Sequence, residues 1–183
     1  MNWIHTLLIL ALAFIAVFVQ TAFTGLRTAL GVQLDLLPAL TVYASLSCGP
    51  VTPVLLAVFG GLAFDSQSAN PLGISIFPLL LIAFVLQHYR GLILREQIFA
   101  QWTIGFAASA AAPLLTLLLL LNTDQQPLVG WFSLWQWVIV AAIGGALTPV
   151  WFYMLDWLLG CLSYQRIEGT PFRADREIKR GRM

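Results

Sequence analysis

Charged side chains are rare in this chain, so the few that interrupt its apolar stretches are the first candidates for chemistry. Asp, Glu, Lys and Arg make up 9% of the residues, whereas 60% are hydrophobic. The stretch GGLAFDSQSANPLG, residues 60–73, ends an apolar run with Asp65. Burying a carboxylate is costly, and the C-terminal end of a helix is unfavourable for an anion. We therefore expect Asp65 to have a partner, either Arg27 or the backbone N–H groups of residues 66–69.

Two other carboxylates lie at the ends of apolar segments. Asp35 begins one of them, and an acid near a helix N-terminus stabilises the helix by about 0.3–1 kcal/mol. Asp156 lies near the end of the last apolar segment, next to Trp157. We expect it to reach lipid headgroups or to pair with a basic residue of a neighbouring loop.

Residue sets that would indicate catalysis or metal binding are missing from the sequence. Its two histidines, His5 and His88, begin or end apolar segments, and Cys48 and Cys161 match no zinc-binding spacing. No phosphate-binding GxxxxGK loop occurs. We therefore expect no enzyme activity, no cofactor and no metal, and we expect the cysteines to remain free in a reducing compartment.

The composition predicts the elements that hold these residues. The mean hydropathy is +0.87, well above that of a soluble domain, and a membrane span needs roughly 20 apolar residues. A Gly-Pro pair after Cys48 divides one apolar region, which as a single helix would be roughly 43 Å long and exceed the bilayer core. The prediction is an all-α polytopic membrane protein with six short transmembrane helices, over residues 3–23, 34–48, 51–65, 72–88, 98–121 and 131–160.

The positions of Lys and Arg orient these spans, because cytoplasmic loops are enriched in both. With six spans and both termini in the cytoplasm, eight of the nine basic residues lie inside, and Arg27 is the exception. Six of the eight belong to residues 165–183, which we expect to form a basic cytoplasmic tail that binds anionic headgroups.

Small residues recur at four-residue spacing in the last two apolar segments. In lipid, such rows let helix backbones approach closely. They serve either as packing faces within the bundle or as a face for a partner helix. The candidate residues are Gly105, Ala108, Ser109, Ala112, Ala141 and Gly145.

Three segments occur in a characteristic order, namely LDLLPALTVYASLSCGP, AVFGGLAFDSQSANPLGIS and TPVWFYMLDWLL, followed by a basic tail. Their order and spacing over about residues 3–162 resemble the rod-shape-determining protein MreD family. In that family an acid opens span two, a Gly-Pro turn leads into span three, and Gly-Leu-x-x-Asp followed by Pro-Leu-Gly begins span four. The corresponding residues here are Asp35, Gly49 and Pro50, Gly61 and Asp65, and Pro71 with Gly73.

The resemblance implies a non-enzymatic scaffold subunit of the bacterial cell-wall elongation complex, located in the inner membrane. Proteins of this family bind MreC and support lateral peptidoglycan synthesis beside a RodA-type glycosyltransferase, a penicillin-binding transpeptidase and MreB. The family is similar in fold to the substrate-binding membrane subunits of energy-coupling-factor transporters. The tail of this chain is longer than the family usually carries.

That similarity of fold provides an alternative function, a small-molecule-binding membrane subunit of such a transporter. Its ligand would lie at the outer side of the bundle. The sequence favours the scaffold, because the outer loops offer few hydrogen-bonding side chains and the small-residue rows suit helix binding. The residues available for a ligand are Arg27, Asp35, Asp65, Gln67 and Asn70.

Overall fold

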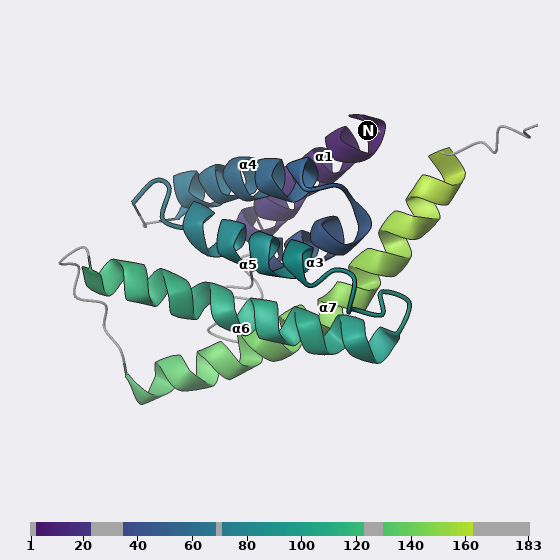
Figure 1. The fold of residues 1–183 in the computed structure, drawn as a ribbon. Helices are drawn as coiled ribbons and strands as arrows, with labels where there is room; N and C mark the ends of the chain where they lie inside the picture. The colour runs from purple at the N-terminus through teal and green to yellow at the C-terminus, as the bar shows by residue number, and fades with distance from the viewer. Residues whose placement is uncertain (1–2, 23–34, 69–70, 123–129, 163–183) are drawn as a thin grey trace, which may run out of the picture.

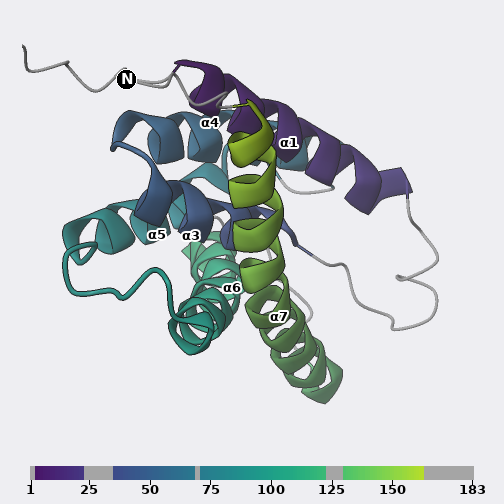
Figure 2. The ribbon, with the colours of Figure 1, turned by 90° about the vertical axis from the view of Figure 1, so that its right-hand side faces the viewer.

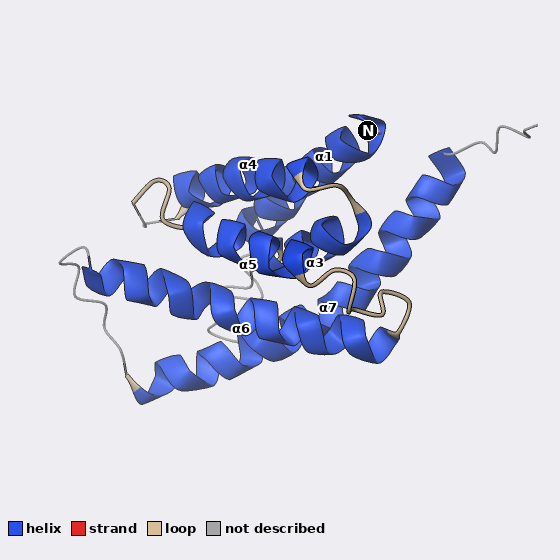
Figure 3. Ribbon diagram, viewed as in Figure 1, coloured by secondary structure: helices blue, strands red, loops and turns tan. Residues whose placement is uncertain are grey.

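Six helices make up the part of the chain that the computed structural model describes, residues 3–22, 35–68, 71–122 and 130–162 (Figures 1 and 3). Within these ranges there is no strand, so the predicted all-α class is confirmed. The helices are α1 Trp3–Ala22, α3 Leu37–Ser47, α4 Val51–Gln67, α5 Ile76–His88, α6 Ile98–Asn122 and α7 Trp131–Leu162.

Three of the helices are long and apolar enough to cross a membrane. These are α1, α6 and, within α7, the stretch Ser133–Cys161. The helices α3, α4 and α5 have 11, 17 and 13 residues. At about 1.5 Å per residue, α3 is about 16 Å long, roughly half the thickness of the hydrocarbon core.

The short helix α3 forms the centre of the bundle. Every residue from Leu37 to Leu46 is buried, and α3 packs against each of the other five described helices. A helix that is buried on all sides carries no polar face, as expected for a core element. The pair α6 and α7 crosses on one side of α3, while α1 and α4 lie on the other side (Figures 1 and 2).

The turn between α3 and α4 divides the second apolar region into two helices, as the sequence predicted. It consists of Cys48, Gly49 and Pro50, and the φ of Pro50, −63°, suits a residue that starts a helix. The carbonyl oxygen of Cys48 accepts hydrogen bonds from Gln87 Nε2 at 3.2 Å and Arg90 Nη1 at 2.9 Å. These two bonds join the turn to the C-terminal end of α5.

The helix ends differ from the predicted spans by a few residues. The largest difference is at α5, which begins at Ile76 rather than at residue 72, because residues 72–75 form a turn in which Gly73 has a φ of +94°. The helix α3 begins at Leu37 rather than at residue 34, and the backbone N–H of Leu37 donates to Asp35 Oδ1 at 3.0 Å. The expected basic tail, residues 165–183, lies outside the described residues.

Candidate functional site

Asp65 joins the end of α4 to the beginning of α5. Its side chain is buried, with 2% of the residue exposed, and its Oδ2 accepts hydrogen bonds from the backbone N–H groups of Gly73 at 2.8 Å and Ser75 at 3.1 Å. Free N–H groups at a helix start and the positive end of the helix dipole both stabilise an anion. We call the contacts of Asp65 with Gly73 and Ser75 the α4–α5 lock.

The donors to Asp65 are not the ones nearest in sequence. Helix α4 continues to Gln67, and the backbone N–H of Ser68 donates to the backbone carbonyl of Asp65 at 3.2 Å. The N–H groups of residues 66–68 therefore belong to the helix and its end, residue 69 lies outside the described residues, and the carboxylate accepts from the next turn instead. Arg27, the other expected partner, lies outside the described residues.

A close approach of the two backbones supports the lock. A Cβ atom on Gly61 would lie 3.0 Å from the backbone nitrogen of Ile76 and 3.0 Å from its Cγ1. Within the turn, the carbonyl of Pro71 accepts from the backbone N–H of Ile74 at 3.3 Å. The two motifs around Asp65 and Gly73, separate in sequence, thus form one joint.

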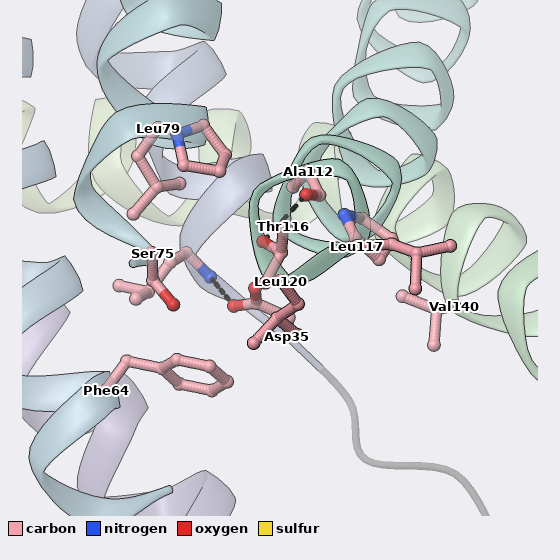
Figure 4. Close-up of a pocket in the computed structure, with 12 residues that line it drawn as sticks. Asp35, Phe64, Ser75, Leu79, Ala112, Thr116, Leu117, Leu120 and Val140 are labelled. Carbon is pink, nitrogen blue, oxygen red and sulfur yellow. Dashed lines mark hydrogen bonds between the residues drawn. The ribbon is translucent and has the colours of Figure 1, made fainter. Parts of the chain in front are cut away.

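Next to this joint lies a cavity of about 280 Å³ between the ends of α3, α4 and α5 and the flanks of α6 and α7. Figure 4 shows Asp35 and Ser75 at the cavity, with Phe64 on one side and Leu120 close to Asp35. We call it the Asp35 cavity. Its walls are mainly apolar, and Thr116, the third polar residue lining it, donates from Oγ1 to the carbonyl of Ala112 at 3.0 Å.

Three of the five residues named for a ligand are described, and among these three only Asp35 lines the cavity. Asp65 is engaged in the α4–α5 lock, and Gln67 is exposed at the end of α4. Arg27 and Asn70 lie outside the described residues. The sequence did not indicate Ser75 and Thr116, because a Ser or Thr in an apolar segment is ordinary.

A second polar cluster joins three parts of the chain at the other end of α3. Tyr43 donates its hydroxyl to Asp156 Oδ1 at 3.0 Å, and Arg95 Nη2 lies 2.8 Å from the same oxygen. The ring centroids of Phe152 and Tyr43 are 4.9 Å apart. The guanidinium carbon of Arg95 lies 5.9 Å from the centroid of the Phe152 ring. Asp156 thus pairs with a basic loop residue, which was one of its two predicted roles.

Tyr43 was missed in the sequence because it lies 113 residues before Asp156. No local pattern connects an aromatic residue in one helix with an acid that far away. The loop that supplies Arg95 is held in turn by Gln101, whose Nε2 donates to the carbonyl of Arg95 at 2.7 Å.

The small residues of α6 and α7 pack against each other, so they form no face for a partner helix in this structure. A Cβ on Gly105 would overlap Thr148, and one on Gly144 would overlap Ser109. A Cβ on Gly145 would lie 3.1 Å from Phe106 Cβ and 3.1 Å from the carbonyl of Trp102.

The remaining candidates for a partner-helix face are also buried. Ala108, Ala112 and Ala141 are 6%, 4% and 1% exposed, and the first two belong to the main hydrophobic core. Of the two roles expected for these rows, the structure shows packing within the bundle, and the alternative of a partner-helix face formed by these residues is corrected. The rows allow close packing within the bundle because α6 and α7 follow each other and cross.

Metal-binding groups are not assembled in the part of the chain that the structure describes. Within it, no three His, Cys, Asp or Glu side chains lie close enough to hold a metal ion. Cys48 is buried, Cys161 is exposed, and both are free thiols.

The described part of the chain is all-helical and has three helices long and apolar enough to cross a membrane. Its buried carboxylate, Asp65, joins two of the helices. No protein-family model matches the chain, and no curated protein or solved structure is significantly similar to it.

Proposed function

We propose that this chain is an MreD-like scaffold subunit of the bacterial cell-wall elongation complex. The observation that carries the proposal is the α4–α5 lock. The sequence motifs behind the resemblance, Gly61 to Asp65 and Pro71 to Gly73, contact each other through the Asp65 carboxylate and the close approach at Gly61. Motifs that form one structural joint support the resemblance more strongly than separate short matches.

In this proposal the protein lies in the inner membrane with six spans and both termini in the cytoplasm. The exposed surface of the described helices suits lipid, since large apolar side chains such as Phe84, Phe99 and Tyr153 are 76%, 77% and 79% exposed. A soluble monomer rarely exposes so many apolar side chains together. The short helices α3, α4 and α5 cross the bilayer together with their flanking turns.

The scaffold works by binding the transmembrane helix of an MreC-like protein, beside the RodA-type glycosyltransferase, the penicillin-binding transpeptidase and MreB. The buried small-residue rows leave the lipid-facing surfaces as the place for this contact. The described polar side chains of the α4–α5 lock and the Tyr43 cluster are engaged in holding helices together. Such a construction suits a protein that presents a rigid apolar surface.

Co-purification tests this function. The tagged chain is expressed with the MreC-like protein of its own genome and extracted in mild detergent, and bound proteins are identified by mass spectrometry. We expect the MreC-like protein to be enriched with the wild type and with the surface control Ser66→Ala, whose hydroxyl bonds only locally to the carbonyl of Ala63. Absence of that protein from correctly inserted wild type would overturn the proposal.

A second candidate function is the small-molecule-binding membrane subunit of an energy-coupling-factor-type transporter. The Asp35 cavity is the observation that favours it, because ligand sites are concave, mainly apolar and contain a few polar groups. The two functions differ in what co-purifies. A transporter subunit brings with it an ATPase module and no MreC-like protein.

A further inference from the structure

The Asp35 cavity has the size of a small-molecule site. Its volume of about 280 Å³ exceeds the roughly 150 Å³ of an engineered apolar cavity that binds benzene. Phe64 and Leu79 form one side of the wall, and Leu117, Leu120 and Val140 form the other. A molecule with one aromatic ring and a short chain would fill this space and bury mainly apolar surface.

The polar side-chain atoms that line the cavity are the oxygens of Asp35, Ser75 and Thr116. Asp35 Oδ1 accepts a hydrogen bond from the backbone N–H of Leu37, and the amide side chain of Gln20 lies beside the carboxylate, which retains acceptor capacity. Ser75 is 8% exposed, and Figure 4 shows its hydroxyl at the start of α5, on the side of the cavity where Asp35 lies. Among the described residues that line the cavity, none is Lys, Arg or His.

Within the described part of the chain, no Lys, Arg or His lines the cavity to pair with this carboxylate. A carboxylate beside apolar walls is stabilised by a cation that donates charge-assisted hydrogen bonds at about 2.7–2.9 Å. The hydroxyls of Ser75 and Thr116 offer further acceptors near it. Among the described residues lining the cavity, an anionic ligand would meet the like charge of Asp35 and no cationic side chain.

We infer that the Asp35 cavity binds a compact cationic amphiphile, with its apolar body between α5, α6 and α7 and its ammonium group on Asp35. This site rests on the Asp35 cavity and not on the helix contact of the proposed scaffold, since it is defined by the ends of α3, α4 and α5 and the flanks of α6 and α7. It also gives the transporter alternative a definite ligand class, a small aromatic or aliphatic amine.

The test uses the purified full chain in nanodiscs of phosphatidylcholine, a lipid without net charge. Binding of 2-phenylethylammonium and of its neutral analogue 2-phenylethanol is measured by titration calorimetry against empty nanodiscs. We expect the amine to bind to the wild type. Asp35→Asn should lower the affinity for the amine by at least about tenfold and leave the affinity for the alcohol nearly unchanged. The amide of Asn retains an oxygen that accepts from Leu37.

A pair of substitutions on α7 tests the place of binding. Val140→Phe fills the cavity, whereas the same change at Val138, which is 47% exposed, adds the ring on the surface. We expect Val140→Phe to abolish binding of both compounds and Val138→Phe to leave it unchanged. Leu117→Trp provides a second obstruction from α6 if Val140→Phe fails to fold.

Three outcomes overturn the inference. The first is amine binding that does not exceed the signal of empty nanodiscs. The second is equal affinity in wild type and Asp35→Asn, which would make the site apolar without charge selection. The third is normal binding in well-folded variants that fill the cavity. The co-purification of an MreC-like protein is unaffected by these outcomes, so the two proposals fail separately.

Discussion

Asp65 Oδ2 accepts a 2.8 Å hydrogen bond from the backbone N–H of Gly73, eight residues further along the chain. Gly73 has a φ of +94°, a conformation that residues with a side chain rarely adopt. The carboxylate and the glycine are therefore coupled, because the turn that Gly73 permits brings its own N–H and that of Ser75 to the end of α4. A buried acid in an apolar protein thus ties the end of α4 to the turn that begins α5.

We predict that Asp65→Leu destabilises the protein by about 2–4 kcal/mol, because two backbone donors lose their acceptor, one in a buried and one in a part-buried hydrogen bond. Asp65→Asn should cost less, since an amide oxygen still accepts from both donors. The measurement is thermal unfolding of the purified protein in mild detergent. Ser66→Ala, next to Asp65 and exposed, is the control and should behave as wild type.

A harmless Asp65→Leu, with unchanged melting temperature and membrane level, would show that the lock does not stabilise the helices. A loss of the same size in Ser66→Ala would show that the end of α4 is merely sensitive to any substitution.

The cluster at Asp156 predicts unequal contributions from its two partners. Tyr43 is 1% exposed, so Tyr43→Phe should cost about 1–2 kcal/mol by removing a donor from a partly buried bond. Arg95→Gln should cost less than about 1 kcal/mol, because the side chains of Arg95 and Asp156 are 40% and 49% exposed. Thermal unfolding of both variants, alone and with Asp156→Asn, measures each coupling. A larger loss for Arg95→Gln than for Tyr43→Phe contradicts this order.

Apolar segment lengths and breaking residues were sufficient to predict the helices. The Gly49-Pro50 pair correctly divided α3 from α4, because a proline lacks the N–H that a continuous helix needs. The start of α5 was placed too early because Leu72 and Ile74 are apolar like the helix itself. Only the acceptor at Asp65 and the φ of Gly73 reveal that these residues belong to a turn.

The contacts between distant residues could not be predicted in the same way. Spacing indicated that Gly105, Ser109 and Gly145 belong to close-packed helix faces, but spacing does not say which helix lies opposite. The structure places α6 against α7, with Gly144 rather than Gly145 opposite Ser109. The Asp35 cavity was likewise hidden, because its lining comes from five separate helices or their ends.

The proposed six-span arrangement predicts which loops are reached from outside the cell. Single cysteines are introduced at residues 93, 125 and 175 in a chain whose Cys48 and Cys161 are replaced by serine. A membrane-impermeant thiol reagent should label position 125 in intact cells and label positions 93 and 175 only after lysis. The reason is that residue 93 lies in the basic loop after α5, and basic loops remain in the cytoplasm. Labelling of 93 or 175 in intact cells, with 125 protected, contradicts the topology.

The contact between Gly144 and Ser109 predicts opposite effects for the same substitution at two positions of α7. Gly144→Ala places a methyl group on the side chain of Ser109, and such overpacking costs about 1–3 kcal/mol. Gly160→Ala meets nothing within 4 Å and removes a flexible glycine from the helix, so it should leave stability unchanged or raise it by up to about 1 kcal/mol.

Adding Ser109→Gly should restore part of the stability lost in Gly144→Ala, because it removes the atoms that the new methyl group meets. Ser109→Gly alone should be destabilising by about 1 kcal/mol, as a glycine inside a helix, so the cycle isolates the contact. Melting temperatures in detergent that show no rescue in the double variant would mean that α6 and α7 do not meet at these two residues.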